Sequence, residues 1–467
     1  MGSILPTLFE YGMKFLIFTE HGEIADLAAY LLHVEGHDVL LHIENDTCKQ
    51  IAEGIVPHLK EWWRAIGEGY VWVFDSCCFG NLQDWLREQG EAVVGGCEAA
   101  DELENDRQLG QDWFKEAGFD QSFSRNFKQI DDALAFVLEH SDTLWILKQN
   151  GEAPKHLSHK GQFETNEDMI FHLEDMKKHW NEAEYGPVDF DLMEVVEGTE
   201  VAASAFFNGE RFLENSEGKV VGFLNFEEKK EADGGTGETC GEMGTTFVGV
   251  DETNDLFSNI LLRPEIQARL VAIGFRGVFD INCILADDGR LVALEATCRP
   301  GVPSTSYEYI EGLDSPVGEL LSAMAKGINR KIEIHMGLGM VMCVVAKPFP
   351  LEADVEDEAT SMGERLWILQ DGIPILEFTP EQRRHIHLYN FMLKTNEETG
   401  ETYYSVPTKS GYLYTVTARG EYISTTRDEL IHYIKQNTYI PGAKWRSDIG
   451  KRVEAFEYEQ ELSRPVS

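Results

Sequence analysis

The sequence predicts a multidomain α/β protein, and three observations support this prediction. The chain has 467 residues, which corresponds to roughly two to four domains of ordinary size. Its hydrophobic content of 43% is enough to form full cores. In the N-terminal part, apolar runs of strand length alternate with stretches of helical spacing, which is typical of β-α-β units around a parallel sheet.

The first β-α-β unit occupies the beginning of the chain. We expect a strand at Lys14–Phe18, a helix over residues 23–35 and a second strand at Asp38–Ile43. The turn between the first strand and the helix holds one glycine, and Glu20 and Glu23 flank it. These carboxylates disfavour a pyrophosphate at the helix N-terminus, so we do not expect a nicotinamide dinucleotide here.

Three domains are expected from the order of the patterns. An N-terminal α/β domain spans residues 1–104, a central domain spans 105–330 with a small lobe at about 120–196, and a strand-rich domain spans 331–467. Further strands are expected at 70–74, 92–94, 143–148, 190–196, 201–207, 339–346, 366–369, 386–395 and 412–418. Further helices are expected at 82–89, 103–118, 130–139, 166–181, 264–273, 316–327 and 426–436.

The charge balance limits the partners of the protein. Lys and Arg number 40 and Asp and Glu number 82, which gives a net charge of −42. Such a charge repels nucleic-acid backbones and anionic membranes, so small molecules are the expected partners, and the oligomeric state stays open. The sequence has no Cys-x-x-Cys pair and no apolar run of membrane-spanning length. A reduced, cytoplasmic setting is therefore expected.

A lysine ends one expected strand, and a basic loop follows it. The strand is Thr143–Lys148, and the polar loop behind it carries Lys155 and Lys160. In so acidic a chain, these cations predict a loop that folds over a phosphate chain, with a solvated surface loop as the alternative. A glycine-rich segment at 232–244 is expected to be mobile, and it lacks the Gly-Lys-Ser/Thr of a P-loop.

The segment from Arg276 to Pro303 predicts a β-hairpin. Two β-rich runs flank Asp288 and Gly289, a dipeptide that favours a two-residue turn. With this turn, Asp287 pairs with Arg290, and side chains alternate between an apolar face and a polar face along both strands.

The predicted hairpin register gathers four oxygen-bearing side chains on the polar face. Asn282 lies opposite Glu295, and Asp280 lies opposite Thr297. Carboxylates rarely enter apolar strands unless they are paired or bind a metal, and oxygen-only ligands suit Mg²⁺ or Mn²⁺. A solvated hairpin face with two acids is the alternative, and the local pattern does not decide between the two.

Four motifs stand in an order that resembles the ATP-grasp superfamily and, within it, the phosphoribosylamine–glycine ligases (glycinamide ribonucleotide synthetases). Residues 197–200 correspond to the Glu-Gly-Glu-Glu hairpin of that family, and 227–244 to its Asp-His-Lys-Arg loop with Gly-Gly-Met-Gly. Residues 294–299 correspond to Leu-Glu-Phe-Asn-x-Arg, and 445–450 to Tyr-Arg-x-Asp-Ile-Gly. The resemblance covers nearly the whole chain.

The resemblance implies a fold and an activity. The fold would comprise a Rossmann-like pre-ATP-grasp domain, a two-lobed α+β ATP-grasp domain and a C-terminal domain like that of glycinamide ribonucleotide synthetase. The activity would be that of an ADP-forming ligase that activates a carboxylate with ATP and joins it to an amine, as in purine biosynthesis. The expected cofactors are ATP and Mg²⁺ or Mn²⁺, because phosphate charge must be neutralised as it develops.

The resemblance also implies roles for individual residues. Lys148 and either Lys155 or Lys160 would contact phosphates, residues 194–196 would offer backbone groups to adenine, and Glu200 would hold the ribose. The whole expected ATP-binding set is Lys148, Lys160, Glu194, Val196, Glu197, Glu200 and Lys229. The expected metal ligands are Asp280, Glu295 and Thr297, and the expected catalytic residues are Arg299 and Lys148.

Two departures from the family pattern bear on the substrate. Thr297 stands where the family has asparagine, and the loop Thr19–Ile24 has acids where the family has an arginine. The acidic loop disfavours a phosphorylated sugar amine and favours a different, cationic acceptor. The alternatives are a true phosphoribosylamine–glycine ligase and a non-catalytic nucleotide-binding homologue. The presence of Lys148, Asp280, Glu295 and Arg299 argues against the non-catalytic homologue.

Overall fold

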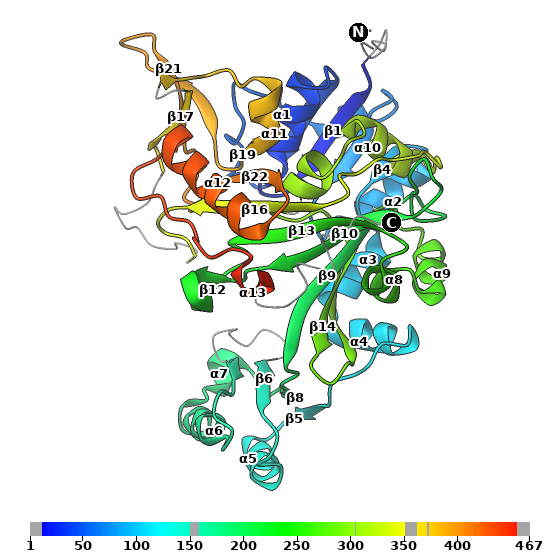
Figure 1. Ribbon diagram of the computed structural model, residues 1–467, viewed down its shortest axis with the longest axis vertical. Coiled ribbons are helices and arrows are strands. Elements are labelled where there is room, and N and C mark those ends of the chain that lie inside the picture. Colours follow the sequence, from blue (N-terminus) through cyan, green and yellow to red (C-terminus); the bar gives the residue numbers. More distant parts are fainter. Residues whose placement is uncertain (1–11, 150–157, 304, 351–361, 371–372, 455–467) are drawn as a thin grey trace. The chain divides into compact units, whose positions relative to one another are not determined.

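The computed structural model describes residues 12–149, 158–303, 305–350, 362–370 and 373–454 (Figure 1). The chain divides into two compact units. Unit 1 comprises Met1–Gly110, Val201–Asn282 and Glu295–Ser467, and unit 2 comprises Gln111–Glu200 and Cys283–Leu294. The predicted small lobe at about 120–196 lies within unit 2, while the domain limits at 104 and 330 stay predictions.

Unit 1 begins with a parallel four-stranded sheet in the order β2-β1-β3-β4. Its strands are β1 (Lys14–Thr19), β2 (Asp38–Ile43), β3 (Val71–Phe74) and β4 (Ala92–Val94). Because β2 lies on one side of β1 and β3 on the other, the direction of winding reverses between β1 and β3. Helices accompany the sheet: α1 (Ala25–His33), α2 (Gly80–Glu88), α3 (Glu98–Asn105), the short helix η1 (Trp62–Ala65), and α10 (Val317–Lys326), which packs on β3 and β4.

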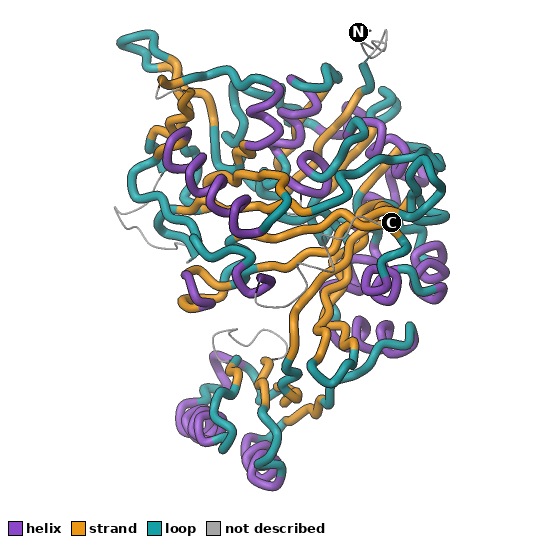
Figure 2. The backbone as a smooth tube through the Cα atoms, viewed as in Figure 1, coloured by secondary structure: helices purple, strands orange, loops and turns teal. Residues whose placement is uncertain are grey.

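An eight-stranded sheet forms the rest of the core of unit 1, in the order β15-β14-β9-β10-β13-β16-β22-β19 (Figure 2). In chain order its strands are β9 (Gly198–Phe207), β10 (Val221–Glu227), β13 (Gly244–Asp251), β14 (Gly277–Ala286), β15 (Leu291–Thr297), β16 (Leu338–Val345), β19 (Ile386–Leu388) and β22 (Tyr412–Gly420). Nearly every residue of β10 and β13 is buried. Such continuous burial shows that both faces of the sheet are covered there.

Smaller elements complete unit 1. Helix α12 (Ile423–Asn437) lies over β16 and β22 (Figure 1). The other helices are α8 (Asp255–Leu261), α9 (Pro264–Ala272), η4 (Ser306–Glu311), α11 (Pro380–His385) and α13 (Lys451–Glu454). The remaining strands are β11 (Lys230–Ala232), β12 (Thr236–Thr239), β17 (Arg365–Gln370), β18 (Ile373–Pro374), β20 (Met392–Thr395), β21 (Thr402–Ser405) and β23 (Thr438–Tyr439).

Unit 2 is built on an antiparallel sheet in the order β5-β8-β6-β7. Its strands are β5 (Ser124–Phe127), β6 (Trp145–Gln149), β7 (His159–Lys160) and β8 (Phe190–Glu194), and its helices are α4 (Arg107–Glu116, which starts in unit 1), α5 (Ile130–Glu139), α6 (Glu167–His179) and α7 (Glu182–Tyr185). Phe127, Phe136, Trp145, Leu173 and Phe190 belong to one buried cluster. These large aromatic side chains bury enough surface to give a small unit its own hydrophobic core.

Most expected elements are present within a few residues, but two expectations are wrong. The helix expected at 103–118 is two helices, because Asp106 has an extended backbone and its carboxylate accepts the N–H of Leu109 at 3.0 Å, as a cap does. The strand expected at 386–395 breaks between β19 and β20. There the buried Asn390 exchanges hydrogen bonds with the backbone at Thr408 instead of pairing in a ladder.

The C-terminal motif packs onto the glycine-rich segment. Arg446 is only 2% exposed, and its guanidinium binds Asp448 at 2.8 Å and Glu228 at 3.2 Å. The same Asp448 accepts the N–H of Gly234 at 2.6 Å. The segment expected to be a mobile loop is thus a β11–β12 hairpin that is tied to the C-terminal motif.

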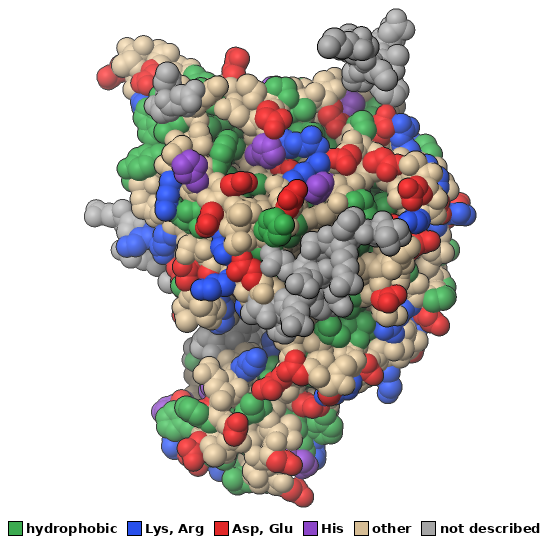
Figure 3. Space-filling model, viewed as in Figure 1, with side chains coloured by type: hydrophobic (Ala, Val, Ile, Leu, Met, Phe, Trp, Pro, Cys, Tyr) green, Lys and Arg blue, Asp and Glu red, His purple; other side chains and the backbone are tan. Residues whose placement is uncertain are grey.

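Charged side chains are scattered over the face of the molecule shown in Figure 3. On the face shown in Figure 3, acidic side chains are spread between basic and polar ones. No helix in the part of the chain that the structure describes is long and apolar enough to span a membrane.

Substitution of Arg446→Met is expected to destabilise the protein by about 3–5 kcal/mol, because Glu228 and Asp448 would lose a buried cation. Urea unfolding measures this free energy. Arg452→Met is the matched control: it also contacts Glu228, at 3.2 Å, but its side chain is 58% exposed, so a loss of at most about 1 kcal/mol is expected. Equal losses in the two variants would contradict the assignment.

Candidate functional site

Two of the expected phosphate-binding lysines share one face of the unit 2 sheet. Lys160 on β7 lies opposite Ile146 on β6, and Lys148 follows two residues later on β6. Residues opposite each other, and residues two apart in one strand, point to the same face. Lys148 is partly buried and Lys160 is exposed. The alternative candidate, Lys155, lies outside the described residues.

The expected adenine-binding segment connects β8 to β9. Residues 195–197 belong to no strand, so Val196 lies where backbone groups can serve a ligand. The Glu194 carboxylate contacts Arg290 at 3.5 Å and accepts the N–H of Phe123 at 3.3 Å. Glu200 lies in β9 and is partly exposed.

A glycine is required in the turn that carries Glu197. A Cβ atom at Gly198 would stand 2.2 Å from the carbonyl oxygen of Leu285, and the φ angle of Gly198 is +153°. The exposed Glu197 accepts the N–H of Asp287 through its carbonyl at 3.1 Å. The Glu-Gly pair therefore holds the start of β9 against the hairpin.

The hairpin turn differs from its prediction. Gly289 has a φ of +87° and donates to the Ala286 carbonyl at 2.8 Å, while Ala286 donates to the Arg290 carbonyl at 2.9 Å. The loop thus has three residues, because Asp288 does not adopt the positive φ that the two-residue turn needs. The predicted pair Asp287–Arg290 is wrong.

The turn bears on the pairs that were predicted across the hairpin. The pairs Asn282–Glu295 and Asp280–Thr297 were derived from the two-residue turn, and they stay predictions. Asp280 is 8% exposed, and its carboxylate accepts the amide N–H of Asn225 at 3.2 Å. Glu295 is 60% exposed instead, and Lys229 lies 3.6 Å from its carboxylate.

The expected metal ligands fit a hard divalent cation by their chemistry. Asp280, Glu295 and the half-buried Thr297 offer oxygen atoms alone. Beside them, Glu242 and Asn225 each hold one buried side-chain oxygen that has no hydrogen-bond partner. Among the described residues, no three His, Cys, Asp or Glu side chains are spaced to hold a metal ion. The donor set is suitable, while its assembly stays a prediction.

Sequence reasoning did not identify the buried carboxyl cluster that surrounds Asp280. Burial, with Glu227 nearby, raises the pKa values of Asp280 and Glu242 well above the usual range. Burial also raises the pKa of Glu308 to about 8. One signal was present, since Glu242 stands at a position where the related motif has glycine. Burial thus disfavours the charged form of these carboxyl groups.

Lys229 lies at the edge of this carboxyl cluster. Its ammonium contacts Glu227 at 3.2 Å and Glu295 at 3.6 Å. In this structure the Lys229 ammonium is thus paired with carboxylates, and its ATP-binding role stays a prediction.

A second cluster lies where β1 and β3 end. Thr19 closes β1 and donates its hydroxyl to Asp75 at 2.6 Å, and Ser76 donates to the other Asp75 oxygen at 2.8 Å. Burial, followed by the charge of Glu23, raises the pKa of Asp75 to about 7. We name Glu20, Glu23, Asp75, Glu104 and Arg299 the switch-point cluster.

Arg299 is both an expected catalytic residue and a member of the switch-point cluster. Its guanidinium contacts Glu104 at 3.0 Å. Burial lowers the pKa of Arg299, but Glu104, Cys77 and Glu23 outweigh it, so the net shift is upward. Arg299 thus keeps its charge, and Glu104 orients it.

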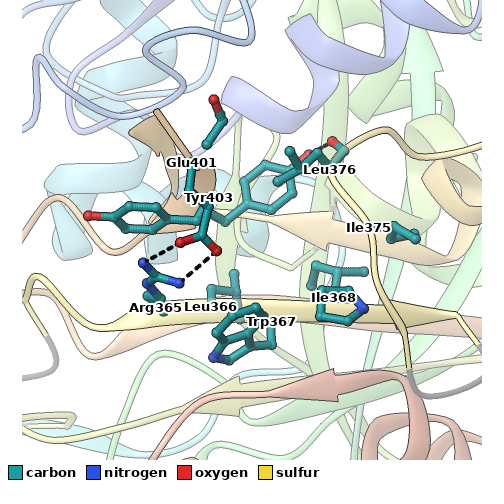
Figure 4. Close-up of a pocket in the computed structure, with 11 residues that line it drawn as sticks. Arg365, Leu366, Trp367, Ile368, Ile375, Leu376, Glu401 and Tyr403 are labelled. Carbon is teal, nitrogen blue, oxygen red and sulfur yellow. Dashed lines mark hydrogen bonds and ion pairs between the residues drawn. The ribbon is translucent and has the colours of Figure 1, made fainter. Parts of the chain in front are cut away.

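A pocket between β17 and β21 is a weaker candidate (Figure 4). Its volume of about 200 Å³ is below the range of typical ligand sites. Arg365 is already paired with Glu401 at 3.1 Å and stacks on Tyr403 at 4.0 Å from the ring centroid. We therefore assign no ligand to it.

Asp75→Asn tests the electrostatic state of the switch-point cluster. The folded carboxyl keeps its proton up to about pH 7, while the unfolded one loses it near pH 3.8. The folded state thus binds the extra proton between these values, and the stability of the wild type falls as pH rises through this window. In the variant, the free energy of unfolding measured with urea is expected to fall less steeply between about pH 4 and pH 7, because the contribution of Asp75 is missing. Glu88→Gln, on an exposed acid of α2, should keep the wild-type slope.

Comparisons with known proteins agree with the fold and the motifs, although no family model matches the chain. The phosphoribosylamine–glycine ligase of Vibrio parahaemolyticus is 22% identical over 388 residues, which are 81% of this chain and 82% of that protein. The structure of the Thermotoga maritima phosphoribosylamine–glycine ligase matches with a TM-score of 0.64 at 17% identity, over 94% of this chain and 100% of that one.

A more distant structure shows how widely the fold is shared. The biotin carboxylase domain of the Hydrogenobacter thermophilus 2-oxoglutarate carboxylase, solved with MgADP and bicarbonate, matches with a TM-score of 0.56 at 13% identity, over 97% of this chain and 96% of that one. With the ordered motifs and the sheets described above, these likenesses show that the chain has the ATP-grasp fold and that it is similar to phosphoribosylamine–glycine ligases.

Proposed function

We propose that this ATP-grasp ligase joins glycine or another amino acid to an amine acceptor other than phosphoribosylamine. The ligase class follows the relatives, whose names describe the joining of an amine to glycine. The single observation behind the altered acceptor is the group of acidic side chains Glu20, Glu23 and Asp75, at the loop where the family has an arginine. Negative charge at this loop would repel the phosphate of a phosphorylated sugar.

The proposed reaction has two steps. A carboxylate oxygen of the donor attacks the γ-phosphorus of ATP, the bond from that phosphorus to the bridging oxygen breaks, and ADP leaves as the acyl phosphate forms. The amine nitrogen then attacks the acyl carbon, the carbon–oxygen bond to phosphate breaks, and the nitrogen loses a proton as the amide forms. Developing negative charge on the phosphoryl oxygens is what the cationic side chains must stabilise.

Each unit supplies part of this chemistry in the proposal. In unit 2, Lys148 and Lys160 would bind phosphate oxygens, and they are supported by their common face on the β6–β7 pair. The connecting segment at 195–197 would bind adenine through its backbone, beside Glu200 for the ribose. In unit 1, Arg299 would contact the acyl phosphate, and its partner Glu104 would orient it.

Asp280, Glu295 and Thr297 would hold the divalent cation, Mg²⁺ or Mn²⁺. Their oxygen-only donor set supports this assignment. A bound cation would supply neutralisation of phosphate charge. Thr297 is a neutral ligand, so the two carboxylates would provide most of the attraction.

Product analysis tests the acceptor. The purified chain is incubated with ATP, Mg²⁺ and glycine or other amino acids, each with phosphoribosylamine or with a panel of amines. Amide products are identified by mass spectrometry, and ADP release is followed by a coupled assay. Amide formation with a non-phosphorylated amine is expected. Efficient coupling of glycine to phosphoribosylamine would show the parent reaction instead, and absence of ATP turnover with every pair would indicate a non-catalytic homologue.

Glu295→Gln is expected to lower amide-coupled ADP release by about a hundredfold or more, because removal of one anionic metal ligand is worth several kcal/mol in such sites. Initial rates over a Mg²⁺ titration provide the measurement. Glu238→Gln, on the exposed strand β12, changes the same charge and should leave the rates unchanged. Wild-type turnover in Glu295→Gln would refute the metal assignment.

A further inference from the structure

One face of the eight-stranded sheet carries enclosed polar side chains. Asn225 and Glu227 stand two residues apart in β10, and Thr245 lies opposite Glu227 in β13. Side chains in these relations share a face of the sheet. The carboxylate of Asp280 on β14 reaches the same face across the small Ala202 of β9, where it accepts the amide N–H of Asn225 at 3.2 Å. Asn225 is 1% exposed, so this face is closed to bulk solvent.

The π-helix η4 covers this face. Its Tyr307 stacks on Phe247, with ring centroids 4.8 Å apart, and Phe247 lies opposite Asn225 in β13. The next residue, Glu308, is 1% exposed. Burial, then Ser204 of β9 and the charge of Glu227, act on the pKa of Glu308, so its carboxyl group lies over the same strands. Single π-helical turns are rare and are found mostly at functional sites.

Glu242 completes the enclosed group from the segment before β13. Its neighbour Met243 donates its N–H to the Glu228 carbonyl at 2.9 Å, which fixes this segment beside the end of β10. The Glu242 side chain is 5% exposed. After burial, the charges that act on the pKa of Glu242 include those of Glu227 and Asp280, so the side chain is directed toward the polar face.

Three buried oxygen atoms in this group receive no hydrogen bond from any residue that the structure describes. They are Oδ1 of Asn225, Oε1 of Glu242 and Oε2 of Glu308. The amide of Asn225 cannot be turned around, because its nitrogen must donate to the Asp280 carboxylate. Buried polar atoms without partners are uncommon in folded proteins and indicate a missing partner. We name Asn225, Glu242 and Glu308 the acceptor triad.

The chemistry of the acceptor triad selects a ligand that donates hydrogen bonds and carries positive charge. The nearest lysine, Lys229, has its ammonium against Glu227 at 3.2 Å and Glu295 at 3.6 Å. No three acidic, His or Cys side chains in the described ranges are placed to hold a metal ion. A protonated amino group brings three N–H donors and one positive charge, which match three acceptors that include two carboxyl groups.

The place of the acceptor triad relates it to the acyl donor. Asn225 holds Asp280, an expected ligand of the divalent cation, so a group bound to the triad would lie next to that cation. An α-amino acid carries its carboxylate and its ammonium group on the same carbon atom, which suits two binding groups this close together. Glu242 stands where the related motif has glycine, so its carboxyl group is an addition particular to this chain.

We propose that the acceptor triad binds the α-ammonium group of the amino-acid donor, and that Glu242 selects amino acids over simple carboxylic acids. This inference rests on the proposed ligase function and names how its donor is recognised. Asn225 connects the two halves of the donor site, because its oxygen accepts from the ammonium group while its nitrogen holds Asp280.

Calorimetric titration of the full chain tests the donor class, with Mg²⁺ and a non-hydrolysable ATP analogue present. The probes are glycine and L-alanine, each compared with the acid of the same carbon skeleton that lacks the amino group, acetate and propionate. The amino acids are expected to bind about tenfold more tightly or better, because hydrogen bonds to a charged group are made only by them. Equal affinity for glycine and acetate, or no binding of either amino acid, would overturn the proposal.

Glu242→Gln removes the charge and keeps the shape of the side chain. Its affinity for glycine is expected to fall by about tenfold or more, while its affinity for acetate does not fall. Glu238→Gln is the matched control, since Glu238 lies in the neighbouring strand β12 and is exposed, and it should bind glycine as the wild type does. Unchanged glycine affinity in a folded Glu242→Gln protein would contradict the role of Glu242.

Two further measurements separate donor binding from other roles of Glu242. Without ligands, Glu242→Gln is expected to melt at or above the wild-type temperature, because a buried carboxyl group with an unpaired oxygen is costly. Its affinity for Mg²⁺ in the presence of the ATP analogue is expected to be unchanged. A lower melting temperature with wild-type glycine affinity would show a structural role, and a loss confined to Mg²⁺ affinity would show a metal ligand; either result overturns the proposal.

The outcomes also distinguish this inference from the proposed function. If glycine binds through Glu242 but no amine supports ADP release, the ligase proposal fails and the donor site stands. If amide formation proceeds at the same rate and with the same KM for the donor in Glu242→Gln, the ligase proposal stands and the donor site fails.

Discussion

The free-energy cost of burying carboxyl groups is the main physical constraint on the structure around Asp75 and Asp280 in unit 1. A buried carboxylate must be hydrogen-bonded, paired or protonated. Asp75 depends on Thr19 and Ser76 for its hydrogen bonds, and Asp280 depends on Asn225. The loss of hydration on burial makes the charged form of these groups costly, which is why these hydrogen bonds matter for the fold.

The sheets determine where these acids meet. The parallel sheet brings the ends of β1 and β3 together, so the Thr19 hydroxyl can donate a hydrogen bond to the Asp75 carboxyl group. The eight-stranded sheet carries Asn225 and Asp280 on two of its buried strands, β10 and β14. A further buried ion pair joins the Arg446 guanidinium to the Glu228 carboxylate at 3.2 Å, next to the glycine-rich hairpin of unit 1. These contacts give a rigid frame for charged groups, as precise chemistry requires.

Local patterns predicted most of the fold because strand and helix periods are local signals. The β1-α1-β2 unit, the helix at 130–139 and the β14–β15 hairpin are present as expected. The strands β10 and β13 were not predicted, since both of their faces are buried and they lack alternation. The two-residue turn predicted from Asp288-Gly289 is wrong, because only Gly289 adopts a positive φ and Asp288 does not. Glu242 and Glu308 were not identified because their burial depends on neighbours that are distant in sequence.

By itself, the sequence determined the order of the motifs, the class of the fold and the residue types available for chemistry. The oxygen-bearing side chains of the hairpin and the lysines around the β6 strand could be named from it, because composition and spacing are written along the chain. Only the tertiary structure decided which of these side chains are buried and which are exposed. Thr19 and Asp75 stand 56 residues apart, yet hydrogen-bond at 2.6 Å, because pairing of parallel strands brings distant parts of the chain together. The position of Glu23 beside Asp75, and with it the case for a cationic acceptor, follows from that packing.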